Sequence, residues 1–382
     1  MSALAIEDVE DAGEVICVRA RTLDRAVACP GCGTETTRVH EYRERTLADV
    51  PADGRRVLVK VRVRRMRCPV TGCPRQTFRE QVPGVLDRYQ RRTTRAAAQV
   101  SAVARELAGR ASARLLPALG IGTYRMGESS RSREQEVAAL QLAIDLGVRV
   151  IDTAEMYGDG GAEEVVGAAL RDGRRDQAFV VTKVLPSNAS RRGVMAACER
   201  SLTRLSIERI DLYLLHWRGA TPLAETVEAF EQLVQQGRIA RWGVSNFDVD
   251  DMRELYQLAA GSRCAADQVY YSASRRGVEF DLLPWLQSHR LPLMAYCPFD
   301  EGRLLGDPTL AAIGRKHGVD TAQVALAWLL EKPGVIAIPK AGRIEHLRQN
   351  LAAADLKLDA EDLALIDRRW PPPRHKQGLA IV

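Results

Sequence analysis

From residue 116 onward, short apolar runs that end in a polar residue alternate with helical sequence, and this alternation constrains the fold more than any other feature. The runs are LPALGIGTY, RVIDTA, AFVVTK, IDLYLLH, IARWGVSNF, CAADQVYY, LPLMAYCPF and GVIAIPK, eight in all. Eight strand–helix units within about 250 residues predict a closed parallel barrel rather than an open sheet. We therefore expect an α/β fold of the (β/α)8 TIM-barrel type over residues 115–382.

The carboxyl ends of these predicted strands carry polar or aromatic side chains. In a parallel barrel those ends gather on one face, where enzymes with this fold place their chemistry. The residues found there are Asp152, Lys183, His216, Ser245, Asn246, Gln268, Tyr296, Cys297 and Lys340. Each has a structural interpretation when taken alone, since Asp152 can cap a helix, Lys183 can be solvated and His216 can be a satisfied core histidine. Their recurrence at successive strand ends predicts an active site.

Tyr157 adds a proton donor to this set, because it follows Asp152 by five residues in the next loop. An isolated tyrosine hydroxyl has a pKa of about 10, and a nearby lysine cation such as Lys183 lowers that pKa by favouring the tyrosinate. A carboxylate beside the lysine keeps the amine charged and fixed. We therefore expect an Asp152–Lys183–Tyr157 relay that protonates a carbonyl oxygen as hydride reaches the carbon. His216 is expected to hydrogen-bond the same oxygen and orient it.

The barrel region also resembles the aldo-keto reductases. The segments that carry the resemblance are DTAEMYGDGGAEEVVG, VVTK, IDLYLLHW, WGVSNF, DQV, AYCP and IPKA, in this order within residues 116–370. The resemblance implies NADPH-dependent reduction of an aldehyde or ketone to an alcohol, with NADH as the alternative cofactor. It also implies that Asp152, Tyr157, Lys183 and His216 are the catalytic tetrad.

The same resemblance implies residues for the cofactor and the substrate. The nicotinamide is expected at Ser245, Asn246, Gln268 and Tyr296, the pyrophosphate at Cys297, the 2′-phosphate at Lys340 and Arg343, and the adenine at Gln349 and Asn350. Met156 and Trp217 are expected in the substrate pocket, which the short tail PPPRHKQGLAIV leaves less enclosed. We expect small oxo-aldehydes or sugar-derived carbonyls as substrates.

Four of the eight cysteines form two close pairs in the N-terminal third. Cys29 and Cys32 form a C-x2-C turn in CPGCG, and Cys68 and Cys73 form a C-x4-C turn in CPVTGC. Two such turns can converge their thiolates on one Zn²⁺ in the closed tetrahedral geometry of a structural site. We therefore predict zinc, with reduced thiols as the alternative.

Positive charge is concentrated in the same third of the chain. Residues 1–116 contain 22 Lys and Arg against 14 Asp and Glu, a balance of +8, whereas the remainder has a balance of −2. In VLVKVRVRRMRC, valines from Val57 to Val63 alternate with Lys60, Arg62 and Arg64, which predicts a strand with one buried and one cationic face. Residues 88–110 predict one or two helices with a basic leading end. This charge pattern indicates a nucleic-acid partner.

The N-terminal third resembles the head of insertion-sequence transposases that begin with a zinc-binding domain and continue into a helix-turn-helix. The segments that carry this resemblance are CPGCG, HEYRERTLADVPADGRRV, VRVRRMRC, CPRQTFREQVPG and RRTTR. It implies a basic zinc-binding domain over 1–87, a truncated helix-turn-helix segment over 88–114, and weak non-specific DNA binding. Within residues 111–117 the sequence changes from the transposase-like to the reductase-like pattern. The nuclease domain that follows this region in such transposases is therefore missing, and transposition is not expected.

The sequence also bears on the location of the protein and on its overall role. Apolar runs fall short of the roughly 18 residues of a membrane helix, and the acidic start MSALAIEDVEDAGE lacks the basic beginning of a secretory signal. We therefore expect a cytoplasmic protein. A carbonyl reductase is the favoured function, because all four tetrad residues are present. The alternatives are a DNA-binding fusion protein in which the barrel is a passenger or a redox-sensing domain, and an accidental fusion with a poorly folded head.

Overall fold

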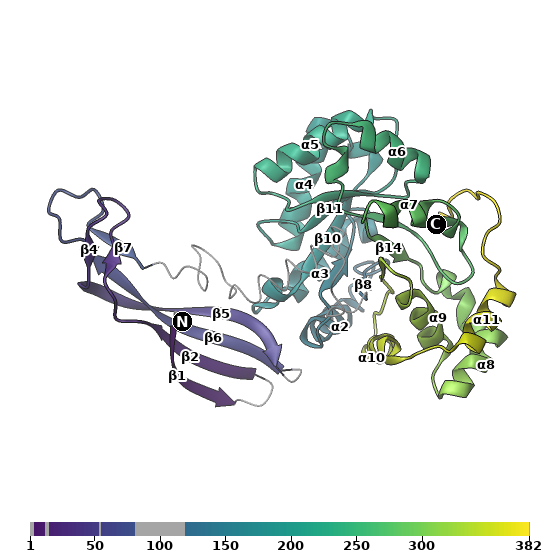
Figure 1. Cartoon of the computed structure of the whole chain (residues 1–382), viewed down its shortest axis with the longest axis horizontal. Coiled ribbons are helices and arrows are strands. Elements are labelled where there is room, and N and C mark those ends of the chain that lie inside the picture. Colours follow the sequence, from purple (N-terminus) through teal and green to yellow (C-terminus); the bar gives the residue numbers. More distant parts are fainter. Residues whose placement is uncertain (1–3, 12–14, 53–54, 81–118, 382) are drawn as a thin grey trace. The chain divides into compact units, whose positions relative to one another are not determined.

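The computed structural model describes residues 4–11, 15–52, 55–80 and 119–381. The chain divides into two compact units, Met1–Ala102 and Val103–Val382 (Figure 1). We refer to the described part of the first as the N-terminal unit and to that of the second as the barrel unit. The predicted helices of 88–110, the predicted domain boundaries after residues 87 and 114, and the predicted junction within 111–117 lie outside the described residues.

The barrel unit is built on eight parallel strands. They are β8 (Ile121–Gly122), β9 (Val150–Asp152), β10 (Phe179–Val184), β11 (Leu212–Leu215), β12 (Trp242–Ser245), β13 (Asp267–Tyr270), β14 (Leu293–Tyr296) and β15 (Val335–Ala337). Neighbours in the sheet follow chain order from β8 to β15. The last strand closes onto the first, because the Gly120 amide donates to the Ala337 carbonyl at 2.8 Å and the Gly122 amide donates to the Pro339 carbonyl at 2.9 Å. The predicted (β/α)8 barrel is confirmed.

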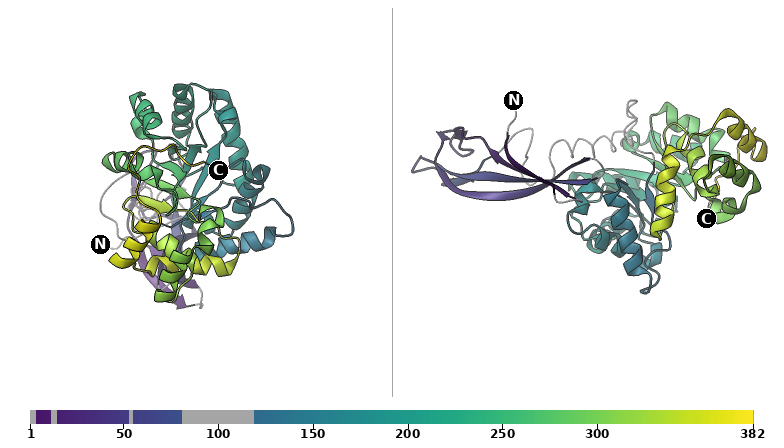
Figure 2. Two further views of the ribbon diagram at one scale, coloured as in Figure 1. Left: turned by 90° about the vertical axis from the view of Figure 1, so that its right-hand side faces the viewer. Right: turned by 90° about the horizontal axis from the view of Figure 1, so that it is seen from below.

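Helices follow the strands and pack around the outside of the barrel (Figure 2). They are α2 (Arg133–Asp145), α3 (Gly161–Ala169), α4 (Arg191–Leu205), α5 (Leu223–Gln235), α6 (Val249–Gln257), α7 (Leu282–Ser288), α8 (Pro308–His317), α9 (Thr321–Leu330), α10 (Ile344–Ala352) and α11 (Ala360–Arg369). Three of them begin at capping boxes whose N-cap residues are Asp248, Asp320 and Asp359. A carboxylate at this position satisfies backbone amides that lack a partner in the first turn, so the sequence fixes where these helices start. Among the helices described, none is long and apolar enough to cross a membrane.

The N-terminal unit is a sheet with a small appended hairpin. Its strands are β1 (Leu4–Asp11), β2 (Val15–Thr22), β3 (Val27–Ala28), β4 (Glu35–Thr36), β5 (Val39–Ala52), β6 (Arg55–Arg67) and β7 (Thr77–Arg79). The main sheet has the order β1-β2-β6-β5, with β7 also paired to β6, and β3 pairs with β4. Strand β2 runs parallel to β6, whereas the other pairs in this unit are antiparallel.

Strand β6 has the predicted apolar face but not the complete predicted cationic face. The valines from Val57 to Val63 are at most 8% exposed, and Arg62 lies on the exposed side. Arg64 departs from the prediction, because it is only 3% exposed and forms an ion pair with Glu80 at 2.6 Å. Strand β7 pairs with the end of β6 and so carries Glu80, the next residue, to the Arg64 guanidinium. The alternation of charged residues in β6 does not predict this burial, because the ion-pair partner comes from the residue that follows another strand, β7.

Candidate active site and metal centre

Side-chain alternation along the strands directs the predicted site residues into the barrel. Residues two apart in a strand share a face. Val150 and Phe179 belong to an apolar cluster formed by the side chains that point into the barrel. Asp152 follows Val150 by two positions, and Lys183 follows Phe179 by four. His216 follows β11 with the same alternation. These polar side chains therefore also point into the barrel, and they lie between the apolar cluster and the carboxyl ends of the strands.

Lys183 is fully buried and lies at the centre of the hydrogen-bond network at this end. Its Nζ donates to Asp152 Oδ2 at 2.8 Å, to the Thr153 carbonyl at 2.8 Å and to the Tyr157 hydroxyl at 3.2 Å. The side-chain amide of Gln268 donates to the other Asp152 oxygen at 2.7 Å. Burial lowers the pKa of Lys183, and the adjacent Asp152 carboxylate opposes that shift. The structure thus brings Asp152, Lys183 and Tyr157 into one continuous network.

Tyr157 begins the short 3-10 turn η1 (Tyr157–Gly160). Burial raises the pKa of Tyr157 well above its ordinary value, and the Asp152 carboxylate adds to the rise. The net pKa shift of Tyr157 is therefore upward, and the expected net lowering is wrong. The Asp152 carboxylate lies 2.8 Å from the lysine amine and offsets its charge, while burial disfavours the tyrosinate. The consequence is a hydroxyl that keeps its proton at neutral pH.

His216 lies against Tyr157 and is held neutral by its surroundings. The two ring centroids are 5.8 Å apart, and the Trp217 ring packs on the imidazole at 4.8 Å. Burial lowers the pKa of His216 to about 3, and the Lys183 charge contributes to the shift. Within the described residues the buried Nδ1 has no hydrogen-bond partner. A neutral imidazole carries one N–H, so it can donate one hydrogen bond to a ligand oxygen while accepting at the other nitrogen.

The residues expected at the nicotinamide form a second polar group next to the first. Ser245 Oγ donates to the Gln268 carbonyl at 2.8 Å, and Asn246 Nδ2 donates to the His216 carbonyl at 3.0 Å. The Tyr296 hydroxyl donates to Asn246 Oδ1 at 2.7 Å. Asn246 holds a left-handed backbone with φ of 60°, which asparagine tolerates better than most residues. These contacts fix the side-chain amide of Asn246 between the His216 carbonyl and the Tyr296 hydroxyl.

The remaining cofactor candidates divide into two sets. Cys297 and Lys340 line the cavity at this end of the barrel, Cys297 half-buried and Lys340 exposed. Burial raises the pKa of the Cys297 thiol to about 11, which leaves it protonated at neutral pH. Arg343, Gln349 and Asn350 lie at or in α10, outside the lining of that cavity as described.

A cavity of about 410 Å³ opens at this end of the barrel. Met156 and Trp217 line it, as expected for the substrate pocket. Tyr124, Phe299 and Ile381 also line it, although sequence reasoning does not identify them. Ile381 comes from the C-terminal tail, so this short tail contributes to the cavity wall. A cavity of this size matches a small-molecule site.

Asp300 supports the cavity wall and is missed by sequence reasoning. Its carboxylate accepts hydrogen bonds from the Tyr270 hydroxyl at 2.6 Å and the Ser274 hydroxyl at 2.9 Å, and from Arg275 Nε at 3.2 Å. The Tyr270 ring packs edge-on against Tyr296 at 5.3 Å. The Asp300 network therefore braces the aromatic ring on which we expect the nicotinamide to stack. Asp300 has a φ of 49°, a backbone conformation that residues other than glycine rarely adopt, and the surrounding hydrogen bonds hold the loop in it.

The four paired cysteines converge in the N-terminal unit. Their sulfur atoms all lie within 4.8 Å of one another. The Cys29 and Cys73 sulfurs are 3.7 Å apart, and those of Cys32 and Cys68 are 3.5 Å apart. Four thiolates that each bind Zn²⁺ at about 2.3 Å in a tetrahedron are about 3.8 Å apart. The cluster fits a structural zinc.

The surroundings of the cluster favour bound thiolates. Backbone amides of Gly31 and Arg75 donate to the Cys29 and Cys73 sulfurs at 3.5 and 3.4 Å. Hydrogen bonding with Thr34 lowers the pKa of the Cys32 thiol to about 6, whereas burial and hydrogen bonds with neighbouring thiols raise the pKa of Cys68 and of Cys73. The N–H donors therefore favour deprotonated sulfur at Cys29 and Cys73, and the lowered pKa favours it at Cys32.

Taken together, the closed barrel, its cavity and the buried Asp–Lys–Tyr network at its carboxyl end are those of a TIM-barrel protein with a small-molecule site. Residues 118–370 match the Aldo/keto reductase family, and the chain belongs to this family of carbonyl-reducing oxidoreductases. It is 49% identical to a methylglyoxal reductase, YeaE, of Escherichia coli K12 over 272 residues, which cover 70% of this chain and 95% of that protein. It is 32% identical to a glyoxal reductase of Bacillus subtilis 168 over 254 residues, or 66% of this chain and 88% of that one.

A solved structure supports the same conclusion. An aldo/keto reductase from Klebsiella pneumoniae, in complex with NADP and acetate, is 52% identical and aligns with a TM-score of 0.69. The alignment covers 70% of this chain and 96% of that one. Outside the barrel, residues 25–73 match the zinc-finger of the transposases IS204/IS1001/IS1096/IS1165. The chain therefore joins a zinc ribbon of transposase type to a reductase barrel.

Proposed function

We propose that the barrel uses NADPH to reduce small 2-oxoaldehydes, with methylglyoxal as the first candidate, to hydroxy-carbonyl products. The observation that carries this proposal is the fully buried Lys183 amine, which joins Asp152 to the Tyr157 hydroxyl beside the cavity. The relatives in Escherichia coli and Bacillus subtilis are named for methylglyoxal and glyoxal, and the Klebsiella pneumoniae structure contains NADP. A cavity of about 410 Å³ suits a compact substrate beside a bound nicotinamide.

In this proposal Tyr157 is the general acid. Its raised pKa keeps the proton on the hydroxyl until the carbonyl oxygen gains negative charge. Lys183 Nζ, 3.2 Å away, then stabilises the tyrosinate that remains. His216, neutral because burial lowers its pKa, donates a hydrogen bond to the same oxygen and orients it. When bound, the reduced nicotinamide supplies the hydride.

The residues that would hold the cofactor are the polar wall of the cavity. We assign the nicotinamide amide to Ser245, Asn246 and Gln268, and its ring to the face of Tyr296. Lys340, exposed at the cavity, would pair with a phosphate of the cofactor. We assign the pyrophosphate to Cys297, the 2′-phosphate also to Arg343, and the adenine to Gln349 and Asn350. The observation that fits this group is the donor and acceptor set already ordered around Asn246.

Turnover of purified full-length protein tests the proposed activity. NADPH oxidation should be fastest with methylglyoxal and glyoxal in a panel that also includes simple ketones, sugar aldehydes and steroids. The small cavity is the physical reason, because bulky carbonyls cannot bring their carbonyl carbon to Tyr157. A preference for steroids, or turnover with NADH and not NADPH, would contradict the proposed substrate class or cofactor respectively.

We also propose that residues 1–114 bind duplex DNA weakly, with 1–87 as a zinc-binding domain and 88–114 as a helical linker that corresponds to a truncated helix-turn-helix. The support is the match to a transposase zinc-finger and the +8 charge balance of residues 1–116. Contacts to phosphates release counterions, so the binding should weaken steeply with salt. Gel shifts with unrelated duplexes should give similar affinities at low salt. Undetectable binding at low salt would contradict this part of the proposal.

A further inference from the structure

The main sheet of the N-terminal unit has one face on which arginines and carboxylates meet. Arg19 and Arg21 on β2 lie on the same face as Arg62 on β6, because the pairing register places Arg21 opposite Arg62 and side chains alternate along each strand. These arginines occupy the two central strands. The edge strand β1 has the sequence LAIEDVED and therefore supplies acids next to them.

A β-bulge in β1 places its acids on the arginine face. The register shifts between Ile6 and Asp8, which leaves Glu7 as the extra residue. Without the bulge, Asp8 and Glu10 would share the face of Ile6, because side chains alternate. With it, Asp8 lies directly opposite Arg19, and Glu10 shares that face. Re-aiming of side chains is a recurrent use of bulges near sheet edges.

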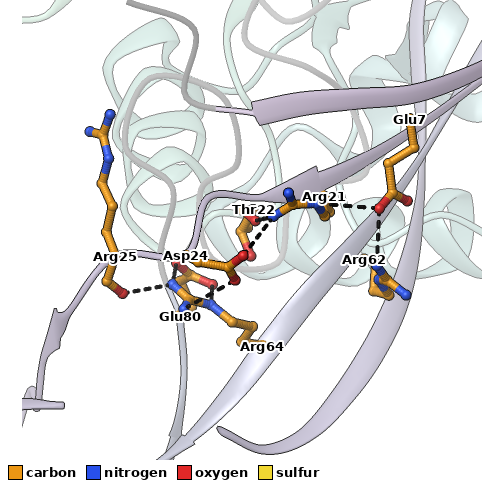
Figure 3. A network of polar contacts seen from close by, with 8 residues as sticks. All are labelled: Glu7, Arg21, Thr22, Asp24, Arg25, Arg62, Arg64 and Glu80. Atoms are coloured by element: carbon orange, nitrogen blue, oxygen red, sulfur yellow. Dashed lines mark hydrogen bonds and ion pairs between the residues drawn. The ribbon is translucent and has the colours of Figure 1, made fainter. Parts of the chain in front are cut away.

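The resulting ion pairs connect β1 to both central strands (Figure 3). Glu7 Oε1 lies 2.9 Å from Arg62 and 3.4 Å from Arg21, and so bridges the two. Glu10 pairs with Arg19 at 2.8 Å, and Asp8 approaches the same guanidinium at 3.9 Å. Arg19, Arg21 and Arg62 thus each have a carboxylate partner on β1, and Arg21 also pairs with Asp24 at 3.0 Å.

These pairs differ in exposure from the pair that Arg64 makes. The side chains of Glu7, Arg21 and Arg62 are 38%, 36% and 52% exposed, whereas Arg64 and Glu80 are 3% and 8% exposed. Exposed ion pairs are screened by solvent and contribute little to stability, so another anion can replace the carboxylate. Arg64 and Glu80 thus form a buried structural ion pair, whereas the carboxylate partners of the arginines that face β1 can be replaced by other anions.

We propose that β1 acts as an internal substitute for a nucleic-acid backbone, whose carboxylates occupy the arginine face and weaken its binding to duplex DNA. The carboxylates along β1 supply the negative charge that phosphates would otherwise bring to Arg19, Arg21 and Arg62. Strands β1 and β2 precede residues 25–73, which match the transposase zinc-finger, so this acidic strand lies outside the matched module. The inference rests on the proposed DNA binding and adds a built-in competitor to it.

Neutralising β1 in the full chain tests the proposal. The variant Glu7→Gln/Asp8→Asn/Glu10→Gln keeps the side-chain shapes and removes the three charges. It should bind a labelled duplex about tenfold more tightly than the wild type at about 50 mM salt, measured by fluorescence anisotropy. Its plot of log affinity against log salt should be steeper by about 2–3, because each freed arginine that contacts a phosphate adds about 0.9 to the slope. Unchanged zinc content shows that the unit is folded.

Two further variants separate this inference from simpler explanations. Glu134→Gln/Glu208→Gln/Glu331→Gln removes the same charge from the barrel and should leave DNA binding at the wild-type level. Adding Arg19→Gln, Arg21→Gln and Arg62→Gln to the β1 variant should abolish its gain. A β1 variant that binds no tighter than the barrel variant overturns the masking role and leaves the proposed DNA binding intact. Absence of binding by every variant at low salt overturns both.

Discussion

Replacing Tyr157 by phenylalanine should lower kcat for methylglyoxal reduction by about 10²–10⁴-fold, the usual contribution of a positioned acid. The substitution removes the hydroxyl that Lys183 holds at 3.2 Å and leaves the ring in place. NADPH binding, followed by quenching of protein fluorescence, should be unchanged, because Tyr157 is not among the groups assigned to the cofactor. Steady-state kinetics with the wild type and the variant measure both effects.

A neighbouring tyrosine offers the matched control. The Tyr124 ring packs edge-on against Tyr157 at 5.3 Å and is 41% exposed. Tyr124→Phe should keep most of the turnover, because its hydroxyl has no part in the relay. Lys183→Met should also lower kcat, but it leaves Asp152 as a buried charge without its partner and so perturbs stability as well. Wild-type turnover by Tyr157→Phe would show that the acid is another group, with His216 as the next candidate.

The pH profile follows from the shifted pKa values. Tyr157 must be protonated to act as the acid, and burial raises its pKa well above its ordinary value. His216 must be neutral, and burial lowers its pKa to about 3. Neither group changes its charge between about pH 5 and 9, so kcat for reduction should be flat over that range. An inflection near pH 6–7 that disappears in His216→Gln would contradict the assigned state of the imidazole.

Loss of zinc should have the second large effect, and it should be confined to the N-terminal unit. Purified protein should contain close to one zinc per chain, and Cys68→Ser should lose it, because the substitution removes one of the four thiolates that complete the closed site. Structural zinc contributes on the order of 10–16 kcal/mol to the folding of small domains, so protection of β5 and β6 amides against hydrogen exchange should collapse. Reductase turnover should remain, since the barrel unit has its own core.

Cys17→Ser is the control for the zinc experiment. Cys17 lies half-buried on β2 in the same unit and outside the four-cysteine cluster. This variant should keep its zinc and its hydrogen-exchange protection. A wild-type protein that is free of zinc and nevertheless protected in β5 and β6 would contradict the metal site.

The barrel and the hydrogen-bond contacts of Lys183 with Asp152 and Tyr157 could be predicted from sequence, because both depend on local periodicity. Alternation along β9 and β10 places Asp152 and Lys183 on one inner face, and parallel strands bring their carboxyl ends together. The same reasoning could not predict the Asp300 network, whose partners come from the loop after β13 and from the end of that strand. It also could not predict the pKa of Tyr157, which depends on how deeply the completed fold buries the hydroxyl.

In the N-terminal unit the limit of sequence reasoning has the same physical origin. The valine pattern of β6 predicts its buried face, because one strand carries the whole signal. The fate of the arginines depends on neighbours that the strand itself does not specify. Glu80 pairs with Arg64 where both side chains are buried, and the bulge at Glu7 turns Asp8 and Glu10 of β1 toward Arg19. A one-residue irregularity in an edge strand thus decides whether Arg19 has a carboxylate partner on β1.

The central claim is that hydride passes from NADPH to the substrate carbonyl carbon at the cavity beside Tyr157. The most direct measurement uses methylglyoxal and NADPH that carries deuterium at both C4 positions of its nicotinamide ring. Mass spectrometry of the product should show an alcohol with a single deuterium on the new carbinol carbon, formed at a rate that falls with Tyr157→Phe. An alcohol without deuterium, or NADPH oxidation without alcohol, would contradict the account.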